Sequence, residues 1–203
     1  GMRARKKENK AAPVLTSLKG GVGQLSQAIA ERLGDIVQYN SEVIAVQPDQ
    51  GGWRIHTNEG SLTSDVIIMA CPAHIQAKLL RGSIPELAKH MDLIPYHSAV
   101  VAAAMLPTDR LTNPPDGFGV LVSRDSELHG ALGVLHSSSI FPSFAPEGHT
   151  LTRTILGGSR YADLISEDTQ SIQNRVHQVH SDLYGLEGQL QDMKAVIPDR
   201  SYA

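Results

Sequence analysis

Apolar residues at helical spacing predict two helices, one near each end of the chain. Near the N-terminus, Leu25, Ile29 and Leu33 recur every four residues, and Gly34 follows them. This spacing places the three side chains on one face of a helix, and glycine commonly ends one. The second apolar stripe consists of Ile172, Val176, Val179 and Leu183. Ser166 precedes it as the expected N-cap.

Between these helices the pattern is typical of β-strands. Runs over residues 36–48 and 53–58 are rich in β-branched residues and are separated by turn residues. They predict an antiparallel meander. A third apolar run, residues 66–70, has no polar alternation and predicts a buried strand that Pro72 ends. A short helix over residues 73–80 follows.

A second sheet layer is expected in the second half of the chain. Four apolar segments are separated by clusters of Pro, Asp, Gly and Ser: residues 96–106, 117–123, 131–139 and 151–158. A last strand is expected at 192–198. The predicted fold class is α+β: a mixed, largely antiparallel β-sheet with a few flanking helices. We expect one domain over residues 13–203, after a disordered basic tail over residues 1–12.

Composition narrows the function classes. The hydrophobic fraction of 41% is ordinary for a globular protein, and no apolar run is long enough for a transmembrane segment. A net charge of -3 gives no reason to expect a nucleic-acid partner. The single cysteine, Cys71, excludes an intrachain disulfide and fits a reducing, cytoplasmic compartment.

The glycine run before the first helix has two interpretations. Gly21 and Gly23 suggest a dinucleotide-binding loop, and Glu42 lies at about the interval of its ribose-binding acid. Ser26 stands where that motif requires Gly or Ala, and no βαβ unit follows. We therefore favour a tight turn that leads the chain into a helix.

No side chain is a strong candidate for catalysis, and no metal site is predicted. His177 and His180 have a ligand-compatible spacing but lack an accompanying carboxylate motif, and both are expected at the surface. His136 precedes three serines, residues 137–139, without a nucleophile elbow, which favours a strand end capped by hydroxyl groups. Cys71 is interpreted as a small hydrophobe. This pattern favours an apolar pocket whose chemistry comes from a cofactor.

Several motifs together resemble the protoporphyrinogen oxidase family, within the flavin amine oxidase superfamily. "SLKGGVGQLSQAIAERLG" (17–34) and "DVIIMACPAHIQAKLL" (65–80) are shared widely by flavin amine oxidases. The series "GFGVLVS" (117–123), "ALGVLHSSSIFPSFAPEG" (131–148) and "ILGGSR" (155–160) is more specific, because its order and spacing separate this family from monoamine oxidases and phytoene desaturases.

The resemblance implies that the chain corresponds to the substrate-binding domain. The dinucleotide fingerprint and the last flavin-binding segment of the family have no counterpart here, so we expect a truncated relative that binds FAD weakly or not at all and is inactive alone. By resemblance, Val43 would contact the adenine end of FAD. Cys71, Pro72 and Ala73 would lie along the cofactor.

The resemblance also implies a tetrapyrrole substrate held between Leu121, Leu135 and Ile155. Relatives commonly have an aromatic residue at the last position, so Ile155 would lose stacking against the macrocycle. The family arginine that meets a substrate carboxylate belongs to the N-terminal part, and Arg153 is no direct substitute for it.

Three hypotheses follow for the role of the chain. It is a substrate-binding domain that acts with a complementary FAD-binding chain; or a non-enzymatic module that binds a porphyrin or another hydrophobic ligand; or a degenerate fragment that forms homodimers through exposed apolar surface. Peripheral membrane association is an alternative to a purely cytoplasmic location.

Overall fold

The computed structural model describes residues 15–190 and 192–196. The chain divides into two compact units, the first ending at Gly34 and the second beginning at Asp35. The expectation of one domain from residue 13 onward stays a prediction, and the basic tail lies outside the described residues. None of the described helices has the length and apolar character needed to cross a membrane.

The first unit contains helix α1 (Gly23–Leu33), which confirms the helix predicted there. Gly21 lies in a hydrogen-bonded turn, with its N–H donating to the carbonyl of Leu18, and this turn leads into α1. Gly34 has a φ of 55° and ends the helix by donating its N–H to Ala30. The apolar stripe of α1 is exposed, and the helix has no buried residue.

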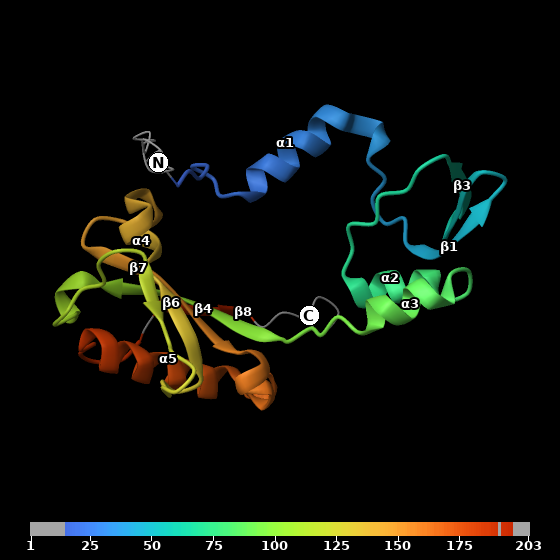
Figure 1. Cartoon of the computed structure of the whole chain (residues 1–203). Coiled ribbons are helices and arrows are strands. Elements are labelled where there is room, and N and C mark those ends of the chain that lie inside the picture. Colours follow the sequence, from blue (N-terminus) through green and yellow to red (C-terminus); the bar gives the residue numbers. More distant parts are fainter. Residues whose placement is uncertain (1–14, 191, 197–203) are drawn as a thin grey trace, which may run out of the picture. The chain divides into compact units, whose positions relative to one another are not determined.

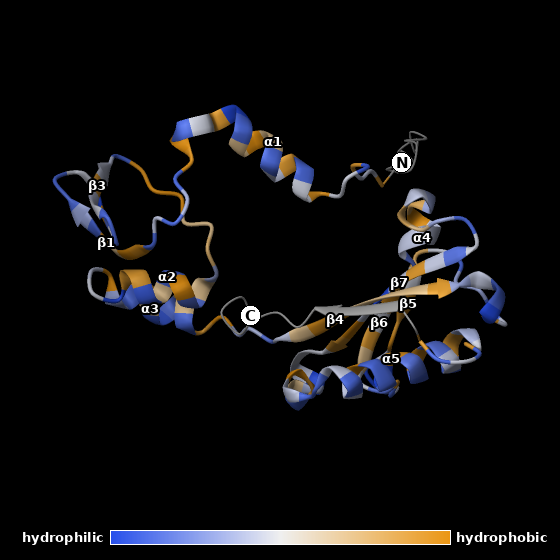
Figure 2. Ribbon diagram, turned by 180° about the vertical axis from the view of Figure 1, so that it is seen from behind, coloured by the Kyte–Doolittle hydropathy of each residue, from blue (hydrophilic) through white to orange (hydrophobic). Residues whose placement is uncertain are grey.

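The first sheet is an antiparallel meander of β1 (Val43–Asp49), β2 (Gly52–Thr57) and β3 (Gly60–Ser64), preceded by the short helix η1 (Gly34–Ile36). The prediction of a buried strand over residues 66–70 is wrong. The polar segment after the Asn58–Glu59 turn pairs with β2 instead. Residues 66–70 belong to no strand, and Ile68 is 91% exposed. Figure 2 shows this apolar segment between β3 and α2.

Two helices pack with this first sheet. Helix α2 (Ala73–Leu80) confirms the predicted one, whereas α3 (Pro85–Asp92) was not predicted although Pro85 at its first turn is a helix-start signal. Val46 of β1, Ala77 of α2 and Ala88 of α3 belong to one buried apolar cluster.

The second sheet contains all five strands predicted for the second half of the chain. Their order is β5 (Gly119–Leu121), β6 (Ala131–Leu135), β7 (His149–Gly157), β4 (Ala99–Pro107) and β8 (Asp192–Val196), and every neighbouring pair is antiparallel. Residues 197 and 198 of the last predicted strand lie outside the described residues. Figure 1 shows this sheet with α5 along one face.

Helix α5 (Thr169–Tyr184) covers this face with Ile172, Val176 and Val179, all fully buried. The expected Ser166 cap is wrong. Ser166 ends the preceding 3₁₀ helix η5 (Ala162–Ser166), and the Asp168 carboxylate accepts the Ser171 N–H at 2.7 Å.

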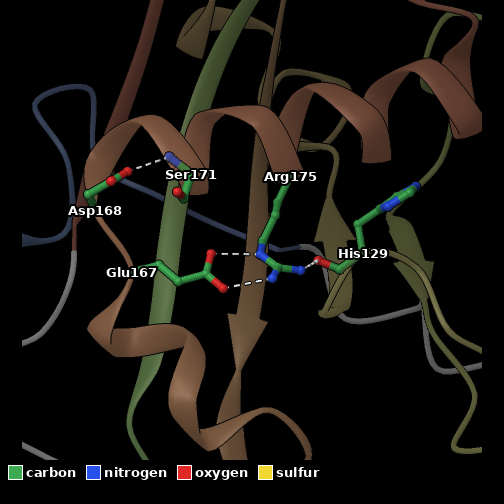
Figure 3. Close-up of polar contacts among 5 residues, drawn as sticks. All are labelled: His129, Glu167, Asp168, Ser171 and Arg175. Atoms are coloured by element: carbon green, nitrogen blue, oxygen red, sulfur yellow. Dashed lines mark hydrogen bonds and ion pairs between the residues drawn. The ribbon is translucent and has the colours of Figure 1, made fainter.

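An ion pair ties the beginning of α5 to its surroundings (Figure 3). Glu167 binds Arg175 through two hydrogen bonds of 2.7 Å, and Arg175 also donates to the carbonyl of His129 at 3.3 Å.

The serines after β6 form the beginning of helix α4 (Ser137–Ile140), not the strand end that the sequence predicted. Ser138 Oγ accepts the N–H of Leu151 at 3.0 Å, and Ser139 Oγ donates to Pro115 at 3.0 Å. The other short 3₁₀ helices are η2 (Thr108–Arg110), η3 (Pro142–Phe144) and η4 (Gly158–Arg160).

Candidate functional site

The strand register builds a groove on the face of the second sheet that α5 leaves open. Ile155 of β7 pairs with Gly133 of β6, which pairs with Leu121 of β5. Directly paired residues of antiparallel strands point to the same face. Because the middle position of this row has no side chain, the two apolar side chains at its ends flank a glycine floor.

The next row of paired residues across these three strands has leucine in the middle, where the first row has glycine. Arg153 of β7 pairs with Leu135 of β6, which pairs with Gly119 of β5. Glycine and leucine therefore alternate between the two rows. An added Cβ at Gly133 would lie 2.7 Å from the carbonyl oxygen of Val120, so close pairing of β5 and β6 requires the glycine.

The resulting groove has a volume of about 380 Å³ and a lining without any charged residue. The lining residues are Phe118, Gly119, Val120, Leu121, Leu132, Gly133, Val134, Leu135 and Ile155. Leu121, Leu135 and Ile155, the predicted substrate contacts, thus come together in one groove. The prediction missed Phe118 and Leu132, and the latter lies at a register shift in β6 that sequence alone does not reveal.

Two large apolar side chains of the groove are unusually exposed to solvent. Leu121 is 89% exposed and Phe118 is 59% exposed. A cluster of large apolar side chains exposed to this degree is typical of a surface that a ligand or partner covers.

A second pocket, of about 430 Å³, brings together two of the four predicted cofactor contacts. Val43 and Cys71 both line it, and the other lining residues are Glu42, Val46, Ile55, Ile67, Ile68, Met69, Ala70, Ile75, Lys78 and Leu79. Pro72 is instead the N-cap residue of α2, and Ala73 is buried, with its N–H donating to Tyr96 Oη at 2.7 Å.

The lining of this second pocket is mostly apolar. Its apolar wall suits a flat ring, with Glu42 and Lys78 as the charged residues of the lining. Pyrophosphate groups usually bind free N–H groups at a helix N-terminus. At the beginning of α2, the N–H groups of Ala73, Ile75 and Gln76 are already donated within the protein. The pocket therefore suits a ring or adenine better than a pyrophosphate.

Buried histidines lie on the α5 side of the second sheet. The prediction that His180 is at the surface is wrong, because its side chain is fully buried. Its Nδ1 donates to the carbonyl of Val176 at 2.7 Å, and Nε2 accepts from Thr152 Oγ1 at 2.7 Å. Burial lowers the pKa of His180. His177 is half-buried, and within residues 15–190 no group of His, Cys, Asp and Glu has the geometry of a metal site.

A second histidine completes this buried network. His136 Nδ1 donates to the carbonyl of Asp116, and Nε2 accepts from the hydroxyl of Tyr184, each at 2.8 Å. Burial raises the pKa of Tyr184 to about 12. These groups are sealed in the core, so they stabilise the packing of α5 and are not placed to contact a substrate.

Comparison with known proteins identifies the family. The sequence profile described as "Flavin containing amine oxidoreductase" matches residues 3–199. The chain belongs to the family of flavin-containing amine oxidoreductases. This family uses a flavin cofactor, in agreement with the resemblance deduced from the sequence motifs.

Curated relatives in the flavin-containing amine oxidoreductase family include protoporphyrinogen oxidases. The human protoporphyrinogen oxidase is 32% identical over 152 residues, which cover 70% of this chain and 30% of that protein. Protoporphyrinogen oxidase 2 of Arabidopsis thaliana is 27% identical over 188 residues, which cover 85% of this chain and 37% of that protein. The chain thus spans about a third of the length of these relatives.

Solved structures confirm the fold as that of flavin-containing amine oxidoreductases. A crystal structure of a candidate protoporphyrinogen oxidase from Exiguobacterium sp. 255-15 has a TM-score of 0.72 at 20% identity, covering 89% of this chain and 39% of that one. Cyclohexylamine oxidase from Brevibacterium oxydans IH-35A has a TM-score of 0.68 at 17% identity, and the match covers 87% of this chain and 38% of that one.

Proposed function

We propose that the groove on the second sheet binds a tetrapyrrole and that the chain forms the substrate-binding portion of a protoporphyrinogen oxidase-like flavoenzyme. The observation that carries this proposal is the convergence of Leu121, Leu135 and Ile155 around a glycine floor. A flat macrocycle is complementary to this surface, because glycine lets it approach the backbone while the flanking side chains contact its edges.

The similarity to curated protoporphyrinogen oxidases supports the choice of ligand class. The exposure of Leu121 supports the same conclusion, because a ligand in the groove would remove its apolar surface from water. Ile155 would give a smooth apolar contact in place of ring stacking.

We also propose that Val43 and Cys71 contact FAD, while Pro72 and Ala73 hold the adjacent backbone at the beginning of α2. When bound, the flavin would accept hydride from a porphyrinogen and be reoxidised by oxygen. The residues of this chain would orient the substrate and exclude water from one face of it. We therefore expect substrate binding without turnover from the 203-residue chain alone.

Fluorescence titration of the purified chain with protoporphyrin IX tests the groove. We expect Leu121→Asp and Ile155→Asp each to weaken binding by roughly tenfold or more, because a carboxylate in the groove loses hydration when the macrocycle covers it. The matched control is Leu93→Asp, at an exposed leucine that follows α3, and it should bind like the wild type.

Two outcomes would contradict the groove assignment: no binding to the wild-type chain, or equal binding by the wild type and both groove variants. Turnover is measured separately, as the oxidation of protoporphyrinogen IX in the presence of added FAD, relative to the spontaneous reaction. Acceleration by the chain alone would overturn the expectation of inactivity and leave the groove assignment intact.

A further inference from the structure

Arg153 lies on the same face of the second sheet as the groove. Its neighbours Thr152 and Thr154 are fully buried on the α5 side, and Thr152 binds His180 there. Because side chains alternate along a strand, Arg153 points to the opposite face. It lies two residues from Ile155 on β7 and pairs directly with Leu135 of β6. The exposed guanidinium is therefore carried at the edge of the glycine-floored groove.

The guanidinium is oriented but not neutralised. Arg153 Nε donates to Ser137 Oγ at 3.2 Å, and Ser137 is itself 3% exposed at the beginning of α4. Within residues 15–190, no carboxylate lies within ion-pair distance of Arg153. With Nε held by the serine, the two Nη groups stay available as a pair of parallel donors.

We propose that Arg153 binds a carboxylate of the ligand whose apolar body occupies the groove. This inference rests on the proposed function and adds to it a determinant of specificity. Arg153 is not the counterpart of the family arginine that meets a substrate carboxylate, so its role is inferred from the strand register and its contacts and not from the resemblance. The preferred ligand is thus a flat apolar molecule with at least one carboxylate arm, and the fully esterified form of the same molecule is disfavoured.

The proposed selectivity for an acid depends on the contrast between the uncharged lining of the groove and the charged Arg153 at its edge. None of the groove-lining residues is charged, so the groove itself cannot discriminate an acid from an ester. Two N–H groups of a guanidinium match the two oxygens of a carboxylate, and such charge-assisted hydrogen bonds are stronger than neutral ones. At an exposed position this contact contributes selectivity more than tight binding.

The test compares protoporphyrin IX, which carries two carboxylates, with its dimethyl ester. Affinities of the purified chain for both probes are measured by fluorescence titration, at a fixed concentration of non-ionic detergent that keeps the free porphyrins monomeric. We expect Arg153→Gln to weaken binding of the acid by roughly five- to twentyfold and to leave binding of the ester within about twofold.

Two further variants separate charge from structure. Arg153→Lys keeps the positive charge and should retain part of the preference for the acid. Arg110→Gln removes an arginine that is also exposed, in η2, and that does not line the groove; it should leave both affinities unchanged. Circular dichroism confirms that the variants are folded.

The outcomes distinguish this inference from the proposed function. If Arg153→Gln binds the acid as tightly as the wild type, or loses affinity for acid and ester equally, Arg153 does not recognise a carboxylate, although the groove assignment stands. If the wild type binds neither probe, or if Leu121→Asp and Ile155→Asp both bind like the wild type, the groove is not the site and both proposals fail.

Discussion

His180 is a residue whose burial gives the protein a specific pH dependence. Burial lowers its pKa below the ordinary value of 6.5 and outweighs the hydrogen bond to the Val176 carbonyl, which acts in the opposite direction. Between the folded pKa and 6.5, the unfolded chain binds one proton more than the folded protein. Well above pH 6.5, His180 therefore adds nothing to the pH dependence of the free energy of unfolding. As the pH falls from 6.5 toward the folded pKa, that free energy decreases by at most about 1.4 kcal/mol per pH unit.

Chemical unfolding at pH 7.5 and 5.5, followed by far-UV circular dichroism, measures this effect. His180→Gln should be less stable than the wild type at pH 7.5, because it cannot bind both Val176 and Thr152 in the same way. It should also lose less stability on acidification. His90→Gln, at an exposed histidine in α3, should keep the wild-type pH dependence. An unchanged pH dependence in His180→Gln would contradict the assignment.

The sequence contained part of the signal for this network. Ile172, Val176 and His180 are spaced four residues apart, so the apolar stripe of α5 already placed the histidine on the buried face. The partner atoms were not predictable. The hydrogen bond between His136 and Tyr184 joins residues 48 positions apart and depends on the packing of α5 across the sheet.

At the scale of elements, the pairing of β5 with β6 depends on Gly133. An added methyl group would lie 2.7 Å from the Val120 carbonyl oxygen, a backbone atom that cannot rotate away. Gly133→Ala should therefore force β5 from its register and destabilise the protein by about 1–3 kcal/mol. Hydrogen exchange measured by mass spectrometry should show faster exchange in the peptide that contains residues 119–121.

Gly82→Ala is the matched control, because an added Cβ there meets no atom within 4 Å. It should leave the exchange of β5 and the binding of protoporphyrin IX unchanged. Gly133→Ala should weaken that binding, since the groove floor and Leu121 both depend on β5. Normal exchange and normal binding in Gly133→Ala would mean that the strand tolerates the methyl group and that the close contact has no structural role.

Strands were predicted correctly where turn residues and the alternation of apolar and polar residues agreed. The strand predicted from hydrophobicity alone was wrong. The apolar run 66–70 resembles a buried strand, yet the two-residue turn at Asn58–Glu59 commits the chain to pair β2 with the polar segment Gly60–Ser64. A tight hairpin fixes its own register before any later segment can compete. Residues 67–70 of this run instead form part of the apolar wall of the pocket that Val43 and Cys71 line.

At the scale of the whole molecule, family motifs predicted groupings that local patterns could not. Leu121, Leu135 and Ile155 lie on three separate strands, and only the resemblance indicated that they share a site. The register then explained why, through the alternation of glycine and leucine in adjacent rows. The role proposed for Arg153, in contrast, was inferred from its place in that register and not from the resemblance.

The groove and the pocket of Val43 and Cys71 have different linings. This difference predicts that the chain binds a substrate-like porphyrin more tightly than it binds the cofactor. The groove has an apolar lining without charged residues. The pocket of Val43 and Cys71 has an apolar wall beside the beginning of α2, where the N–H groups of Ala73, Ile75 and Gln76 are already donated. A dinucleotide such as FAD depends on such groups for its pyrophosphate. We therefore expect the chain to bind protoporphyrin IX while losing added FAD during gel filtration.

Absorbance of the protein peak after gel filtration measures both ligands in one experiment, because flavin and porphyrin absorb at different wavelengths. The expected peak contains porphyrin and little flavin, and Val43→Asp should leave the porphyrin content unchanged. A stoichiometric FAD complex would show that the chain binds the cofactor without a pyrophosphate site at α2. In that case, loss of FAD in Val43→Asp would locate it in this pocket, and the expectation that the chain is inactive alone would no longer follow.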